Sequence, residues 1–381
     1  MQNGQSITST KKEKILVYLF GSLGDTLVAI PALRAVRRNF PDCELSLLQN
    51  TQSDNIVTAA QVIPEELIDN YLSYKSYSGS FSKVVDYYKL RRELRKQNFQ
   101  AVVYLVISER PASSVLRDKL FFRSCGIPRL YGFHAFSKDE IYPFDSNQHP
   151  ALTDNEAIRK LDRLQIDGIN ILREKDLQIP LLKFSGSEIS EMQKWLTERR
   201  RKPKCRLIAI APGCKTEANI WSLENFIQIG DRLINDENCE IIVIGGKAEQ
   251  SDGEKLISCW SEGINAAGVL SVRQSGTLLS LCDFLIGLDT GTTHLAAAVG
   301  TRCLAIYGER NNPGHWYPLG SGHTIIYHPV KCAGCRLFAC PLPNHPCMKQ
   351  ITVDSVWQNW KQISLREKIE ERTSLVKTIE V

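Results

Sequence analysis

LCDFLIGLDTGTTHLAAAVG, residues 281–300, is the stretch that decides the fold. Its apolar run Phe284–Leu288 has the length of a strand buried on both faces, and residues 293–299 have the composition of a helix. Only residues 289–292 separate the two. A buried strand that leads through a short turn into a helix is the unit from which parallel α/β sheets are built.

The turn in this stretch has the chemistry of an anion site. Backbone N–H groups and the positive end of the helix dipole point at whatever lies at the start of a helix. Gly291 lets the backbone approach a ligand closely. Further donors follow along the turn: Thr290, Thr292, Thr293 and His294, the last as a donor or a positive charge. A diphosphate fits these features. The alternative is an ordinary turn with Asp289 as helix cap and His294 on the surface.

The alternation of strands and helices extends outward from this stretch. It is regular from residue 207 to residue 307, and a first β-α-β unit covers residues 14–48, starting with the apolar run KILVYLF. At 381 residues the chain is long enough for two domains. We therefore expect an α/β protein of two Rossmann-like domains with doubly wound parallel sheets. Ligands bind such sheets at the carboxyl ends of the strands, and a cleft between the domains is the expected active site.

The expected organisation has four parts. Residues 1–13 are polar and predict a disordered tail, residues 14–178 form the first domain, and residues 179–352 form the second. Residues 353–381 predict a C-terminal helix, which we interpret as packing back on the first domain.

Asp25 lies in the turn after the first strand and is a candidate general base. The turn has only Gly21 and Gly24, so it is not the three-glycine dinucleotide fingerprint. A carboxylate at this place can take a proton from a hydroxyl group. The alternative is that Asp25 caps the helix that follows.

Two charged residues of the second half are candidate ligand contacts. Lys215 lies in a long loop after a strand, where it can meet a phosphate. Glu249 follows the strand that ends at Gly245-Gly246, where a carboxylate can accept hydrogen bonds from ribose hydroxyls. A solvated carboxylate at a helix start is the alternative for Glu249.

Four of the twelve cysteines cluster near the end of the chain, at Cys332, Cys335, Cys340 and Cys347. Four thiolates at this spacing can hold a structural zinc or iron ion. The outer spacings match no standard zinc finger, and reduced structural cysteines are the alternative.

Composition narrows the class of protein. The net charge of +5 fits an enzyme that handles phosphates or visits an anionic membrane surface, and no pattern indicates nucleic-acid binding. The N-terminal residues lack the apolar segment of a signal peptide, and no apolar run reaches the roughly 18–20 residues that span a bilayer. We expect a cytoplasmic protein. No Asp-x-Asp triplet occurs, which favours stabilisation of a diphosphate by dipoles and side chains rather than by a divalent ion.

Taken together, these segments resemble glycosyltransferase family nine, the heptosyltransferase-like enzymes of bacterial surface polysaccharide assembly. The similarity runs in order along the chain: Gly24-Asp25 with IPAL at 30–33, APG at 211–213 with Trp221, DTGTTHLAAAVG at 289–300, and the cysteine-rich residues 332–348. The resemblance implies the GT-B fold, an inverting mechanism and no cofactor or metal in the transfer step.

The resemblance also implies roles for single residues. Asp25 matches the family's general base, and Glu249 matches a ribose contact. Donor diphosphate contacts are matched by Thr290, Gly291 and His294. The family usually has a lysine two residues before the tryptophan, where this chain has Asn219, and Lys215 is a candidate replacement.

The expected function is transfer of a hexose or heptose from a nucleotide-diphosphate sugar, such as ADP-heptose, to a glycan or lipopolysaccharide precursor. The acceptor implies peripheral contact with the inner membrane, for which the basic residues Arg91, Arg92, Arg95 and Lys96 are candidates. The alternatives are another GT-B enzyme, such as a nucleotide-sugar epimerase, and a non-catalytic nucleotide-sugar-binding protein.

Overall fold

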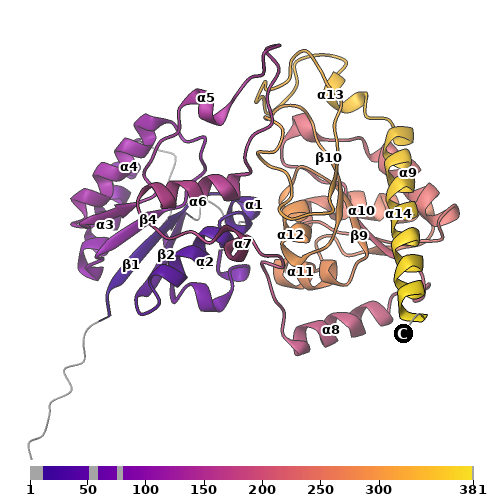
Figure 1. Ribbon diagram of the computed structural model, residues 1–381, viewed down its shortest axis with the longest axis horizontal. Coiled ribbons are helices and arrows are strands. Elements are labelled where there is room, and N and C mark those ends of the chain that lie inside the picture. The colour runs from indigo at the N-terminus through magenta and orange to yellow at the C-terminus, as the bar shows by residue number, and fades with distance from the viewer. Residues whose placement is uncertain (1–11, 51–58, 75–79, 380–381) are drawn as a thin grey trace, which may run out of the picture. The chain divides into compact units, whose positions relative to one another are not determined.

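The computed structural model describes residues 12–50, 59–74 and 80–379, so the expected tail lies almost entirely outside the described residues. The chain divides into two compact units (Figure 1). Unit 1 comprises Met1–Ser137 and Glu156–Leu177, and unit 2 comprises Lys138–Asn155 and Gln178–Val381. Residues 138–155 thus belong to unit 2, although unit 1 continues after them in the chain.

Unit 1 contains a five-stranded parallel sheet in the order β3-β2-β1-β4-β5. Its central strand, β1 (Lys14–Leu19), is almost entirely apolar and is buried on both faces, as a strand between two helical layers must be. The other strands are β2 (Glu44–Asn50), β3 (Asn70–Tyr74), β4 (Ala101–Tyr104) and β5 (Arg129–Tyr131).

Helices α3 (Ser80–Gln97) and α4 (Ala112–Ser124) contribute to one hydrophobic core of unit 1, in which Leu94 and Phe122 pack with Tyr104. The sequence suggests one helix after β1, but the structure has two, α1 (Leu23–Leu27) and α2 (Ile30–Asn39), because Pro31 starts a new helix. The remaining helical segments are α6 (Glu156–Ile166), α7 (Arg173–Asp176), η1 (Ala59–Gln61) and η2 (Glu65–Leu67).

Unit 2 contains a six-stranded parallel sheet in the order β11-β10-β9-β6-β7-β8. The strands are β6 (Leu207–Ala211), β7 (Glu240–Val243), β8 (Ile264–Asn265), β9 (Phe284–Leu288), β10 (Cys303–Ile306) and β11 (Thr324–Ile326). From β6 the chain first builds the sheet toward β8, and β9 then pairs with the other edge of β6. The direction of winding therefore reverses between β6 and β9, which is where open α/β sheets bind their ligands.

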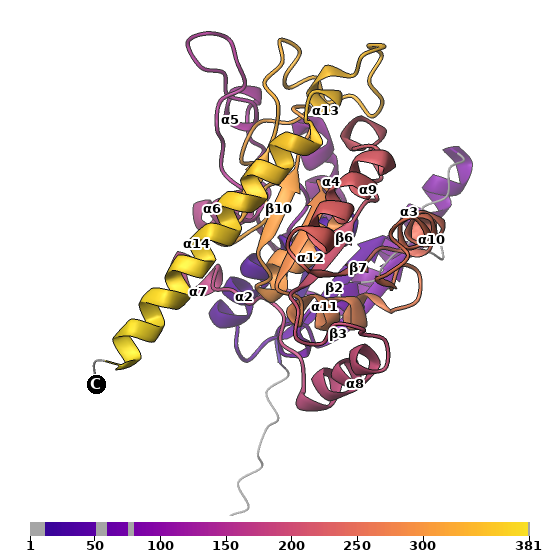
Figure 2. The same cartoon turned by 90° about the vertical axis from the view of Figure 1, so that its right-hand side faces the viewer.

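The last helix, α14 (Val353–Ile379), packs within unit 2 through Val356, Trp357 and Trp360, and Figure 2 shows it running along this unit. The other helices of unit 2 are α5 (Lys138–Ile141), α8 (Gly186–Thr197), α9 (Leu223–Asn235), α10 (Gln250–Trp260), α11 (Val272–Ser280), α12 (Gly291–Val299) and α13 (Pro346–Lys349), with η3 (Glu217–Asn219) and η4 (Lys247–Glu249). Among the described residues, no helix combines the length and the hydropathy that a bilayer crossing requires.

Candidate functional site

The turn between β9 and α12 presents backbone donors at the point where the sheet of unit 2 reverses. Thr290 is the N-cap of α12, and its carbonyl accepts the N–H groups of Thr293 (3.1 Å) and His294 (3.3 Å). Helix geometry leaves the N–H groups of Gly291 and Thr292 without an acceptor inside the helix. Both residues are half-buried, so these donors and the helix dipole define a place for an anion.

Burial changes what two residues of this turn can offer a ligand. Thr293 is completely buried, and its hydroxyl donates to the Leu288 carbonyl (2.6 Å), so the protein itself uses that donor. His294 is 5% exposed, and burial together with the nearby His323 lowers its pKa to about 4. His294 is therefore neutral at pH 7 and can offer a hydrogen bond but not a positive charge.

Asn219 holds the carboxylate of Asp289 in place. Its side-chain N–H group donates to Asp289 Oδ2 (2.9 Å), while Cys214 Sγ donates to the Asp289 carbonyl (3.2 Å). Asn219 is 1% exposed, and its Oδ1 has no hydrogen-bond partner within the described part of the chain. The loop after β6 thus meets the turn after β9. A lysine at position 219 would bring a positive charge to Asp289, which asparagine does not.

Glu249, in the segment after β7, contacts the loop after β6. Its Oε2 accepts the Gly246 N–H group (2.7 Å), and its side chain fills the space over Gly213. A Cβ atom on Gly213 would lie 2.2 Å from Glu249 Cγ, so glycine at this position lets Glu249 keep its place. Burial raises the pKa of the neighbouring Cys214 thiol to about 11.

Charges around Cys214 show which ionic groups the loops bring together. The carboxylates of Asp289 and Glu249 raise the pKa of this thiol, and the guanidinium group of Arg310 lowers it. The side chain of Lys215 lies exposed on the loop after β6. Arg310 is thus a cation close to Cys214, and sequence reasoning missed it. Its place in the loop after β10 was the available signal, because the carboxyl ends of parallel strands share one edge of the sheet.

The cysteine-rich segment, residues 332–348, fixes Arg310 and the loop after β6. Arg310 Nε donates to the Leu337 carbonyl (2.9 Å), and Arg310 Nη2 donates to the Arg336 carbonyl (2.9 Å). The Ala218 N–H group donates to the Phe338 carbonyl (2.8 Å). This segment is therefore a structural support of the site.

The metal interpretation of the four cysteines is not supported. Within residues 12–50, 59–74 and 80–379, no group of three or more His, Cys, Asp or Glu side chains is placed to hold a metal ion. Cys347 is buried in the core of unit 2, whereas Cys332 and Cys335 are exposed and Cys340 is half-buried. Burial, together with the other three thiols, raises the pKa of Cys347.

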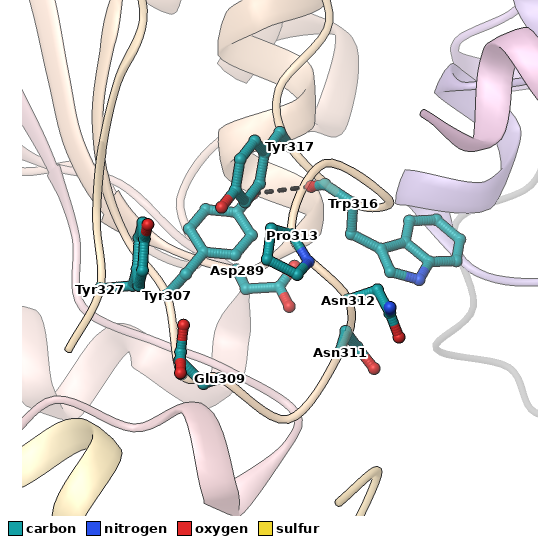
Figure 3. A pocket seen from close by; sticks show the side chains of 10 residues that line it. Asp289, Tyr307, Glu309, Asn311, Asn312, Pro313, Trp316, Tyr317 and Tyr327 are labelled. Carbon is teal, nitrogen blue, oxygen red and sulfur yellow. Dashed lines mark hydrogen bonds between the residues drawn. The ribbon is translucent and has the colours of Figure 1, made fainter. Parts of the chain in front are cut away.

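A pocket opens beside Asp289, between β11 and the loop after β10. Figure 3 shows Tyr307 and Tyr317 close together next to Asp289, and their ring centroids are 5.3 Å apart. The Tyr307 hydroxyl donates to the Trp316 carbonyl (2.8 Å), which shapes the loop. The other lining residues are Gly308, Glu309, Asn311, Asn312, Pro313 and Tyr327. The lining thus combines aromatic faces with amide and carboxylate groups.

Asp25 lies in unit 1, in the first turn of α1. Its Oδ2 accepts the Ser22 N–H group (2.6 Å) and the Ser22 hydroxyl (2.9 Å), so the capping role is present. Gly21 has φ of +142°, and a Cβ atom there would lie 2.3 Å from Asp25 Cγ. Gly21 therefore leaves room for the half-buried carboxylate at the carboxyl end of β1.

Two parallel-sheet α/β units, the second with a turn of free backbone donors where its sheet reverses, are the parts of a GT-B glycosyltransferase. A solved structure described as glycosyl transferase family 9 from Veillonella parvula superposes with a TM-score of 0.69 at 16% identity, covering 93% of this chain and 98% of that one. The structure of Escherichia coli ADP-heptose lps heptosyltransferase II gives a TM-score of 0.66 at 18% identity, covering 93% and 99%. These likenesses confirm the GT-B fold.

Sequence comparison gives the family. The pattern of Glycosyltransferase family 9 (heptosyltransferase) matches residues 87–345, and the chain belongs to this family. Lipooligosaccharide heptosyltransferase 2 of Campylobacter jejuni is 24% identical over 362 residues, which are 92% of this chain and 98% of that protein. The expected enzyme class, a glycosyltransferase, is thereby confirmed.

Proposed function

We propose that this chain is an inverting heptosyltransferase that moves a heptose-like sugar from a nucleotide-diphosphate donor to a lipopolysaccharide precursor. The observation that carries the proposal is the turn at residues 289–294, where the Gly291 and Thr292 N–H groups face outward at the start of α12. Relatives named as lipooligosaccharide heptosyltransferase 2 support the sugar and the acceptor class.

The donor contacts are proposed to surround this turn. The diphosphate accepts the amides of Gly291 and Thr292, the hydroxyls of Thr290 and Thr292, and a hydrogen bond from neutral His294. Glu249 accepts from the ribose hydroxyls, and the sugar lies near Asp289, beside the aromatic loop after β10. An ADP nucleotide is supported by the likeness to Escherichia coli ADP-heptose lps heptosyltransferase II.

In the proposed chemical step, the general base comes from unit 1. Asp25 takes the proton of an acceptor hydroxyl, whose oxygen attacks the anomeric carbon and forms the new glycosidic bond. The bond from that carbon to the donor diphosphate breaks with inversion, and the diphosphate leaves with both electrons. The developing charge is stabilised by the α12 dipole, its first amides and the cations Lys215 and Arg310. No step requires a metal ion.

The acceptor class implies a place in the cell. A lipopolysaccharide precursor is anchored in the inner membrane, so we propose that the enzyme works at its cytoplasmic face as a peripheral protein.

A donor panel combined with a base variant tests the proposal. ADP-heptose should raise the melting temperature of the chain more than GDP- or UDP-sugars, since a ligand stabilises a protein according to its affinity. Asp25→Asn keeps an oxygen for Ser22 but loses the charge, and should lower the transfer rate about 10²–10⁴-fold without weakening donor binding. The exposed Asp42→Asn is the control.

The outcomes separate the alternatives. Transfer by Asp25→Asn at the parental rate contradicts the mechanism. Release of free sugar or an epimer without acceptor indicates an epimerase. Donor binding without turnover in the parent protein indicates a non-catalytic binding protein.

A further inference from the structure

Helix α4 of unit 1 exposes two leucines at the centre of its solvent side. Leu116 and Leu120 are 56% and 60% exposed, although they lie one turn apart on a regular helix. Val115 and Phe122 of the same helix are buried in the core beneath it. The leucines are therefore not needed for packing within unit 1, and both side chains contact water on the same side of the helix.

Helix α3 adds to the same surface. It lies beside α4, because the Tyr87 and Phe121 rings are 5.1 Å apart and Arg91 Nε donates to the Ser124 carbonyl (3.0 Å). Figure 1 shows both helices on one side of unit 1. Tyr88 on the solvent side of α3 is 65% exposed.

Positive charge surrounds these apolar side chains. Residues 85–97 and 112–124 contain eight Lys and Arg against three Asp and Glu, a net charge of +5 that equals that of the whole chain. Two of the three carboxylates are already paired: Asp118 with Arg110 and Arg117, and Glu93 with Lys96. The surface thus combines exposed leucines with cations and little available negative charge.

We infer that this surface, the α3–α4 face, docks the enzyme on an anionic lipid bilayer. It is defined by Tyr88, Arg92, Leu116, Lys119, Leu120 and Arg123. The leucines enter the boundary between headgroups and acyl chains, the tyrosine ring lies at headgroup level, and the cations meet lipid phosphates. The helices lie on the bilayer and do not cross it. The inference rests on the proposed function in one respect: docking would give the enzyme access to a lipid-anchored acceptor.

Other occupants fit this face less well. A second copy would bring two net charges of +5 together, and two leucines with a tyrosine offer little of the roughly 1,200 Å² that a stable interface buries. A nucleic acid would satisfy the cations but would give the leucines no apolar partner. Anionic lipid satisfies both.

Vesicle sedimentation with the full-length protein tests the inference. Vesicles of phosphatidylcholine with about one third phosphatidylglycerol should bind the protein at low salt, and pure phosphatidylcholine vesicles should bind it much less. The double variant Leu116→Gln/Leu120→Gln should lower the partition coefficient at least about tenfold, because two apolar side chains no longer leave water. Arg92→Gln/Lys119→Gln should remove most of the preference for the anionic lipid.

A matched control exists in unit 2, where Leu152 and Leu365 are 76% and 59% exposed. Leu152→Gln/Leu365→Gln should bind vesicles like the parent, and all variants should melt at the parental temperature. The inference is overturned if the α4 double variant binds vesicles as well as the parent does, or if the parent shows no preference for anionic vesicles. It is also overturned if the double variant loses self-association and keeps vesicle binding.

Transfer to a delipidated, water-soluble acceptor separates this inference from the proposed function. The α4 double variant should transfer sugar to that acceptor at the parental rate. If the parent binds vesicles but transfers to no acceptor, the proposed function fails and the docking face stands.

Discussion

Gly213→Ala is the substitution that tests the donor site most directly. The added Cβ atom would lie 2.2 Å from Cγ, 2.7 Å from Cδ and 2.8 Å from Oε1 of Glu249. The backbone of Gly213 does not have a positive φ, so alanine is compatible with the loop itself. The Glu249 side chain must therefore move away from the loop after β6.

The structure gives the expected magnitude. A displaced Glu249 no longer accepts from the ribose, and a hydrogen bond to a charged group contributes about 1.5–3 kcal/mol. The dissociation constant of the donor should rise roughly 10- to 150-fold. Loss of the partly exposed bond from Gly246 should cost about 1 kcal/mol of folding free energy or less, which lowers the melting temperature by only a few degrees.

Isothermal titration with the donor nucleotide and with inorganic diphosphate measures the effect. Gly186→Ala is the control, because no atom lies within 4 Å of its added Cβ. The Gly213 variant should lose affinity for the nucleotide but keep its affinity for diphosphate. Parental affinity for the nucleotide, or an equal loss for both ligands, refutes the assignment of Glu249 to the ribose.

Three further predictions concern single side chains. Because the folded pKa of His294 lies near 4, below the unfolded value of 6.5, its contribution to stability is present above pH 6.5 and is lost as the pH falls toward 4. Between pH 7 and 4.5 the parent should lose about 2–3 kcal/mol more unfolding free energy in urea than His294→Gln does. Lys215→Ala should weaken donor binding by at most about fivefold in calorimetry, since an exposed ion pair contributes little. Cys347→Ser should destabilise the chain by about 1–3 kcal/mol and Cys332→Ser hardly at all, and elemental analysis should find no stoichiometric zinc or iron.

The sequence was sufficient to predict elements whose signal is local. The apolar run of β1 and the strand-turn-helix at residues 281–300 predict parallel sheets because both depend on neighbouring residues alone. The helix start at Gly291 is equally local, since the backbone donors there are consecutive in the chain. Pro31 was a local signal too, but the helical period of the apolar residues predicted one helix, and the break between α1 and α2 was missed.

Features that depend on distant contacts could not be predicted. The Asn219–Asp289 bond joins residues 70 positions apart, and the burial of His294 depends on the loop that carries Trp316. Burial sets the charge of His294, so its protonation state followed from packing and not from residue type. No pattern in the sequence indicates that residues 138–155 belong to unit 2.

The long-range anchors of the loop after β6 also determine when this part of the protein can form during translation. The carbonyl of Ala218 is bonded to His345, 127 positions later in the chain. At about 5–20 residues per second, the ribosome needs roughly 6–25 s to make the intervening segment. Throughout that interval the nascent loop has neither its partner segment nor a finished binding surface. A nucleotide sugar bound as proposed can therefore stabilise the second unit only after residue 345 has been made, and it cannot act as a template for earlier folding of this loop.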